Sequence, residues 1–210
     1  SLGCSKNRVD TELMLGKLGE AGYRFTADPA EADIILINTC GFIESAKQES
    51  IDTILEMAQY KQKGKLKALI VTGCLSGRYQ GELAESLPEV DAFLGVTAQD
   101  EIVQAVEKVL QGQRVQQYHG AALEGNYADR LLTTPGYYAY VKIAEGCNNR
   151  CSYCAIPYIR GNLKSRQMPD ICEEVEALAS RGVKEIILVV QDTSKYGLDL
   201  YHKPMLAPLL

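Results

Sequence analysis

The 210-residue sequence predicts an α/β fold, with an N-terminal open, doubly wound parallel sheet followed by the beginning of a second α/β domain. Three observations support this prediction. Short continuous apolar runs suit strands buried on both faces of a sheet, and segments with helical spacing alternate with them. Cysteines also recur about one βα unit apart, close behind the expected strands.

The N-terminal strands are expected at the apolar runs 34–37 and 68–71, which polar or glycine residues bound. Asp10 precedes a short helix that is expected to end near Gly22. Between the strands, apolar residues at 51, 54, 55 and 58 follow helical spacing, with Gly64 as the stop. A further helix is expected from Gln99 to Leu110, ending before Gly112.

From Gln113 to Pro135 polar, glycine and threonine residues dominate, which indicates a connection between domains. A strand is then expected over 138–143, a helix over 170–181 and a strand over 185–190. We therefore expect a first domain over 1–112, a linker over 113–135 and a truncated second domain over 136–210. Because the sequence lacks an initial Met and stops soon after a strand, we expect an internal piece of a longer protein with little or no turnover by itself.

The composition is that of an ordinary water-soluble chain, with 46% hydrophobic and 23% charged residues. No apolar run approaches the roughly 20 residues of a membrane helix, and no signal segment opens the sequence, so we expect no membrane partner and a cytoplasmic location. The net charge of -5 argues against whole-surface binding of nucleic acid. Seven cysteines in such a chain favour metal or redox chemistry over disulfides.

The stretch EGCNNRCSYCAIPYIRG places Cys147, Cys151 and Cys154 in a C-x3-C-x2-C pattern. Thiolates select zinc or iron–sulfur clusters. A structural zinc site needs four ligands, and neither His119 nor His202 stands at a suitable spacing. Three cysteines suit a cubane with one open iron, although a zinc-stabilised binding module completed by a distant ligand stays open. Cys172 has no cysteine neighbour in the sequence and is interpreted as a small buried residue or a bystander.

Three further cysteines, Cys4, Cys40 and Cys74, are separated by 35 and 33 residues. Cys40 and Cys74 each come just after an expected strand, and Cys4 is expected to do the same. In an open parallel sheet, all three would meet at the carboxyl edge, where such folds build their sites. We therefore predict a second three-thiolate site with an open iron. The alternative, buried core cysteines, would place them within the strands.

The C-x3-C-x2-C loop with Tyr153 before its third cysteine, following a strand, resembles the radical S-adenosylmethionine superfamily. This resemblance implies a partial (βα) barrel and a 4Fe–4S cluster whose open iron is chelated by S-adenosylmethionine. One electron then cleaves the cofactor to a 5'-deoxyadenosyl radical, which removes a hydrogen from an unactivated carbon. By the same resemblance, Tyr153 would lie near the adenine.

Two such sites in this order resemble the methylthiotransferase family, through SLGCSKN, INTCGFIESA, VTGCLSGRY and GCNNRCSYCAIPYIRGNLKSR. The resemblance covers essentially the whole chain. It implies two 4Fe–4S clusters, S-adenosylmethionine as both methyl and radical source, and insertion of sulfur at a C–H bond. An electron donor such as flavodoxin or ferredoxin is implied too. No catalytic residue is assigned beyond the six cluster ligands.

Gly41, Phe42 and Ile43, together with CAIPYIRGNLKSR, resemble the branch of the family that modifies a ribosomal protein. The implied substrate is the β-carbon of an aspartate in protein twelve of the small ribosomal subunit. The tRNA (adenosine) branch, of the MiaB type, more often carries a Ser-Val-Arg type sequence there. Spacing and composition permit either substrate, and RNA contact through a part beyond residue 210 stays open.

Four residues are assigned to cofactor binding: Tyr153, Arg166, Gln191 and Asp192. The segment with Arg160, Lys164 and Arg166 could bind an anionic substrate or the cofactor carboxylate, or could form a solvated basic face. Gln191 and Asp192 follow a strand where radical enzymes of this class place groups near the methionine amino end. The usual Gly-Gly-Glu type sequence is absent, so capping of a loop is the alternative.

Overall fold

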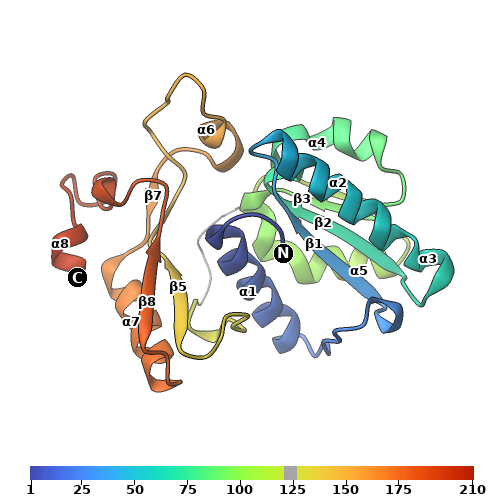
Figure 1. The fold of residues 1–210 in the computed structure, drawn as a ribbon, viewed down its shortest axis with the longest axis horizontal. Coiled ribbons are helices and arrows are strands. Elements are labelled where there is room, and N and C mark those ends of the chain that lie inside the picture. The colour runs from blue at the N-terminus through green and yellow to red at the C-terminus, as the bar shows by residue number, and fades with distance from the viewer. Residues whose placement is uncertain (121–126) are drawn as a thin grey trace.

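The structure, a computed structural model, describes residues 1–120 and 127–210. Its largest sheet, the N-terminal sheet, has four parallel strands in the order β1, β2, β3, β4 (Figure 1). These strands are β1 (Ile34–Thr39), β2 (Ala68–Gly73), β3 (Ala92–Leu94) and β4 (Val115–Gln117). The expected strands at 34 and 68 are confirmed, and each extends two residues further. The sequence pattern did not predict β3 or β4.

Helices cover both faces of the N-terminal sheet, which confirms the doubly wound arrangement (Figure 1). Ala68 and Ile70 of β2 pack towards α1 and α5, whereas Leu69 and Val71 pack towards α2 and α4. This alternation follows the two-residue period of a strand buried on both faces. The helical elements are α1 (Ser5–Glu20), η1 (Pro29–Glu31), α2 (Glu44–Ala58), α3 (Tyr60–Lys63), α4 (Cys74–Ser86), η2 (Val96–Glu101) and α5 (Ile102–Leu110).

Helix α1 begins directly after Cys4, whereas the sequence pattern placed its start after Asp10, so that expectation is wrong. The helix lies between the N-terminal sheet and β5 (Tyr138–Lys142) and contacts both (Figure 1). Its side towards β5 is polar, and Lys6 and Glu12 are buried there. Because polar residues are buried on one side of α1, the usual contrast between an apolar buried face and a polar solvated face is weak. The sequence pattern therefore does not mark where the helix starts.

The C-terminal part opens with the expected βαβ unit, in which β5 pairs in parallel with β8 (Glu185–Val189). The connecting helix α7 (Met168–Ser180) packs on this pair through Ile171 and Leu178. The expected strands and helix of this part are therefore confirmed. The other elements are η3 (Tyr127–Asp129), β6 (Ala144–Glu145), α6 (Ile156–Arg160), β7 (Lys164–Ser165), η4 (Thr193–Lys195) and α8 (Leu206–Leu209).

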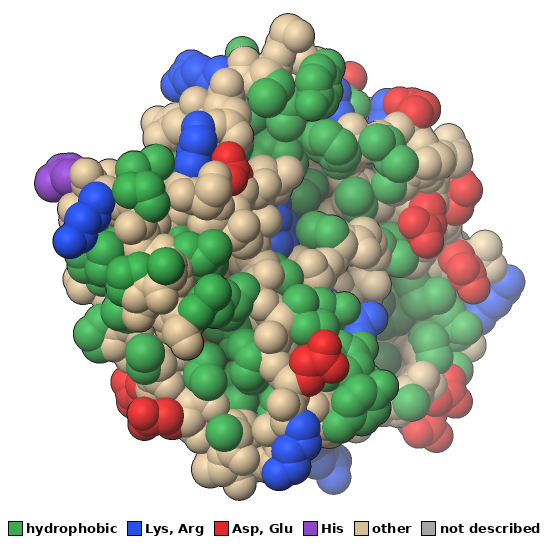
Figure 2. Space-filling view, turned by 60° about the vertical axis from the view of Figure 1, so that its left-hand side comes forward, with side chains coloured by type: hydrophobic (Ala, Val, Ile, Leu, Met, Phe, Trp, Pro, Cys, Tyr) green, Lys and Arg blue, Asp and Glu red, His purple; other side chains and the backbone are tan. Residues whose placement is uncertain are grey.

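The side of the molecule that carries β7 and α8 comes forward in Figure 2, which shows hydrophobic side chains spread between scattered charged ones. Exposed large hydrophobic residues of this part include Tyr153, Tyr158, Leu198 and Leu200. Within the described residues, every helix is too short or too polar to serve as a membrane span.

Candidate iron–sulfur sites

The carboxyl edge of the N-terminal sheet carries the three upstream cysteines. Thr39 and Gly73 form the last registered pair of β1 and β2, and Cys40 and Cys74 come next in the chain. Cys4 reaches the same edge because the N–H of Leu2 donates to the carbonyl of Asn38 in β1 at 2.8 Å. Because parallel strands end at one edge, cysteines far apart in sequence are brought to the same place.

Glycines allow close backbone approach at this edge. Gly3 has a φ of +86°, and a Cβ built on it would lie 2.8 Å from Cys40 Cβ and 3.1 Å from its Sγ. Gly73, with a φ of +98°, would place a Cβ only 2.3 Å from Asn38 Oδ1. A side chain at either position would therefore push apart the loops that carry Cys4, Cys40 and Cys74.

The three-cysteine loop lies between β6 and α6, and backbone hydrogen bonds close it. The N–H of Cys147 donates to the carbonyl of Gly161 at 3.1 Å, and that of Cys154 donates to Cys151 at 3.0 Å. Gly146, with a φ of +69°, approaches Asn162 so closely that a Cβ would lie 2.0 Å from its carbonyl oxygen. Cys147 is buried, whereas Cys151 is exposed.

The two groups of cysteines lie on either side of the contact between α4 and α6. Cys74 is the first residue of α4, and α6 begins two residues after Cys154. Cys74 shares a small hydrophobic cluster with Ile159 of α6 and with Ala155. The structure therefore brings the two predicted sites together, although they are more than 70 residues apart in the sequence.

All seven cysteines are free, and no group of three potential ligands in the described residues is arranged around one metal ion. The cysteines of an iron–sulfur cluster each bind a different iron, so their sulfurs lie farther apart than the ligands of a single ion. A set of three thiolates has the donor chemistry of such a cluster. Binding of an iron–sulfur cluster by each group of three cysteines stays a prediction.

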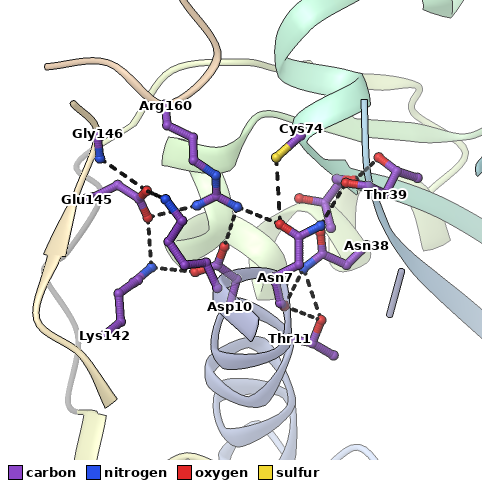
Figure 3. A network of polar contacts seen from close by, with 12 residues as sticks. Asn7, Asp10, Thr11, Asn38, Thr39, Cys74, Lys142, Glu145, Gly146 and Arg160 are labelled. Carbon is purple, nitrogen blue, oxygen red and sulfur yellow. Dashed lines mark hydrogen bonds and ion pairs between the residues drawn. The ribbon is translucent and has the colours of Figure 1, made fainter. Parts of the chain in front are cut away.

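A buried polar network, the cysteine-edge network, joins α1 to Cys74 and to Glu145 and Arg160, which flank the three-cysteine loop (Figure 3). Arg160 donates to Glu145 Oε2 at 2.9 Å, to Asp10 Oδ2 at 3.2 Å and to Asn7 Oδ1 at 2.5 Å. Lys142 donates to the same two carboxylates. Asn7 Oδ1 also lies 3.7 Å from Cys74 Sγ, so one amide connects Arg160 with a predicted cluster ligand.

The charged forms of these groups stabilise one another. Burial by itself would raise the pKa of Glu145, but Arg160, Lys142 and Lys6 hold it well below its ordinary value. Burial would lower the pKa of Arg160, but the carboxylates of Glu145 and Asp10 raise it instead. Burial raises the pKa of the Cys74 thiol, and Arg160 offsets part of that rise.

The structure places three of the four predicted cofactor-binding residues close to the cysteine groups. Tyr153 lies within the three-cysteine loop, with its side chain exposed. Gln191 Oε1 accepts a hydrogen bond from Lys6 at 2.6 Å, and Asp192 accepts one from Asn149 of the loop at 3.0 Å. Asp192 also caps η4, as the loop-capping alternative expected. Binding of the cofactor by these side chains stays a prediction.

Arg166 lies in a second buried network. Its guanidinium contacts Glu174 at 2.5 Å and stacks on Tyr127 at 3.6 Å, and burial lowers its pKa to about 10. A solvated basic face, one alternative for this segment, is wrong for Arg160 and Arg166, because both are buried. The cofactor-binding role of Arg166 stays a prediction, and these contacts occupy much of its donor capacity.

Five residues that the sequence did not single out as site residues take part in the cysteine-edge network: Lys6, Asn7, Asp10, Lys142 and Glu145. One signal was present in the sequence, because Lys6 and Asn7 follow Cys4 closely and Glu145 precedes Cys147. Polar residues beside predicted metal ligands are candidates for the shell that orients those ligands.

Comparisons with known proteins find two separate matches along the chain. Residues 1–95 match the model described as "Uncharacterized protein family UPF0004", and residues 141–205 match the radical SAM superfamily. The fold and the three-cysteine loop thus define a radical S-adenosylmethionine protein with an additional N-terminal α/β part. Use of S-adenosylmethionine and of an iron–sulfur cluster follows from this superfamily.

Curated relatives cover the chain from end to end. It is 55% identical to a protein of Caldicellulosiruptor saccharolyticus, 54% to one of Clostridium botulinum and 53% to one of Pelotomaculum thermopropionicum, each named ribosomal protein uS12 methylthiotransferase RimO. The alignments include 100% of this chain and 48%, 47% and 48% of those proteins. The chain belongs to the methylthiotransferase family of radical S-adenosylmethionine proteins. It spans about half the length of the curated relatives it matches.

Proposed function

We propose that the whole protein is a methylthiotransferase that inserts a methylthio group at the β-carbon of an aspartate in ribosomal protein uS12. The observation that carries this proposal is the meeting of two cysteine groups across the α4–α6 contact. Sulfur insertion requires a sulfur carrier close to the place where the substrate radical forms. The names of the three relatives support uS12 as the substrate.

In this proposal Cys147, Cys151 and Cys154 hold the cluster that binds S-adenosylmethionine, and the three upstream cysteines hold an auxiliary cluster. When bound, these groups supply the electron that cleaves the cofactor and the iron that carries the sulfur. The protein's own contribution is to exclude water and to fix the distance between the sites. Ile159 and Ala155, packed against Cys74, provide apolar surface between them.

The proposed partners follow from this chemistry. A flavodoxin or ferredoxin would supply electrons, and uS12, free or within the ribosome, would be the protein substrate. Contact with RNA would involve parts of the whole protein beyond residue 210. A ribosomal substrate places the reaction in the cytoplasm.

The proposed substrate is tested by peptide mass spectrometry of uS12 from cells with and without the gene. Loss of one methylthio group from uS12 in the deletion strain, restored by the wild-type gene but not by Cys74→Ala or Cys147→Ala, is the expected result. Cys172→Ala is the matched control and should restore it. A deletion that changes only tRNA would show a tRNA methylthiotransferase of the MiaB type instead.

The proposed cofactors are tested by metal analysis of the anaerobically reconstituted full-length protein. We expect about eight irons per chain, and about four after Cys147→Ala. A content near one zinc without charge-transfer absorption would favour the zinc-stabilised module and contradict the proposal.

A further inference from the structure

The cysteine-edge network contains more cations than anions. Within the described residues it holds three cationic side chains, Lys6, Lys142 and Arg160, and two carboxylates, Asp10 and Glu145. All five are at most 6% exposed. A buried charge without a counter-charge is costly, so a surplus of one formal positive charge in such a place calls for an anion nearby.

The second buried network, which also lies between α1 and the C-terminal part, shows that a surplus of positive charge is not a general property of this interface. Arg130 and Arg166 there face Glu12 and Glu174, so two cations meet two carboxylates. Within the described part of the chain, the hydrogen bonds and ion pairs of that balanced network include no cysteine of either group. The unbalanced network is the one that reaches the cysteines.

Arg160 brings the positive charge of this network to the upstream cysteines. Both carboxylates lie between Lys142 and Arg160, because Asp10 and Glu145 each contact the two cations. The Nη2 of Arg160 that donates to Asp10 also donates to the neutral amide oxygen of Asn7, and Cys74 Sγ lies 3.7 Å from that same oxygen. Lys6 follows Cys4 by two residues in the chain, and its Nζ lies 3.8 Å from Glu145 and donates to Gln191.

We propose that Arg160 and Lys6 are positioning residues that supply the counter-charge of the auxiliary cluster bound by Cys4, Cys40 and Cys74. This inference rests on the proposed function, because it assumes that a cluster binds there. A 4Fe–4S core with three thiolates is an anion, and it gains a further negative charge when it is reduced. A nearby fixed cation stabilises the reduced state more than the oxidised state, so it raises the reduction potential.

The test uses the full-length protein with Cys147, Cys151 and Cys154 replaced by Ala, so that only the auxiliary cluster is observed. Its midpoint potential is measured by redox titration followed by electron paramagnetic resonance. Arg160→Gln and Lys6→Gln should each lower the potential by at least the equivalent of a tenfold change in the equilibrium constant, about 59 mV for a one-electron couple. Arg160→Lys, which keeps the charge, should shift it less than Arg160→Gln.

Lys17→Gln is the matched control, because Lys17 is on the same helix and pairs with Asp100, away from the cysteines. It should leave the potential unchanged. Unchanged potentials in Lys6→Gln and Arg160→Gln, or an equal shift in Lys17→Gln, would overturn the inference. If Arg160→Gln does not fold, Lys6→Gln decides the result. Absence of iron from the triple-alanine parent would instead refute the auxiliary cluster itself, and with it the proposed function.

Discussion

The guanidinium of Arg130 donates from Nε to Glu12 Oε2 at 3.0 Å, and both side chains are buried between α1 and the C-terminal part. The other oxygen of Glu12 accepts hydrogen bonds from the backbone and the hydroxyl of Thr133, at 2.8 and 2.9 Å. One carboxylate on α1 therefore holds two residues of the segment that leads to β5.

Glu12→Gln should lower the free energy of unfolding by about 3–5 kcal/mol, because it leaves Arg130 as a buried cation with one fewer partner. Urea unfolding followed by circular dichroism measures this change. Asp33→Asn removes the carboxylate of an exposed pair with Lys67 and should leave the unfolding midpoint where it is. Equal effects of the two substitutions would show that the buried pair has no special role.

Gly146→Ala should remove iron from the radical-type site while the auxiliary site keeps its own. The new Cβ would meet the carbonyl oxygen of Asn162 at 2.0 Å, which displaces the loop beside Cys147. Gly161→Ala is the control, since Gly161 also has a positive φ but has open space around its Cβ position. Iron analysis and the absorption spectrum of both variants decide the matter; full iron in Gly146→Ala would count against the fit of this loop.

Alkylation of the metal-free protein should distinguish the cysteines by burial. Cys4 and Cys151 are exposed and should react first, whereas Cys74 and Cys147 are 5% and 7% exposed and should react slowly. Burial also raises the pKa of Cys74, which reduces its reactive thiolate fraction. Peptide mapping after timed iodoacetamide treatment gives the order, and early labelling of Cys74 would contradict the packing of α4 on α6.

The pKa of Asp192 should lie below its ordinary value because Ser194 and Asn149 donate hydrogen bonds to the carboxylate. A pKa that is lowered by folding adds stability above the unfolded value, near pH 4, and this contribution disappears as the pH falls through the folded pKa. Asn149→Ala should therefore raise the pKa of Asp192, as measured by NMR titration. An unaltered pKa would mean that Asn149 does not hold the cysteine loop to η4.

The strands that the sequence revealed are those with continuous apolar runs, such as 34–37 and 68–71. Strands β3 and β4 contain three residues each, which is too short for a periodic pattern to stand out. Helix α4 was also missed, and its regular spacing is interrupted at Gln80, whose φ is +40°. Local pattern therefore identified one half of the sheet, β1 and β2, and left out the other half, β3 and β4.

The placement of the three upstream cysteines was open to prediction because the carboxyl ends of parallel strands meet at one edge. The partners of those cysteines were not. Arg160 was considered for an anionic ligand, yet the structure buries it against Asp10, 150 residues away in the sequence. A contact of that kind depends on how α1 packs on the C-terminal part, and no spacing within either segment encodes it.

Because the inner side of α1 is polar and pairs with the C-terminal part, the chain cannot be divided between its two parts without leaving buried charges unpaired. A piece that ended at residue 112 would keep Asp10 and Glu12 but lose their cationic partners Lys142, Arg160 and Arg130. The complementary piece would keep those cations and lose the carboxylates of α1. Helix α1 thus belongs to the interior of both parts of the chain. A chimaera that took one part from a relative would have to keep the charged residues on both sides of this interface.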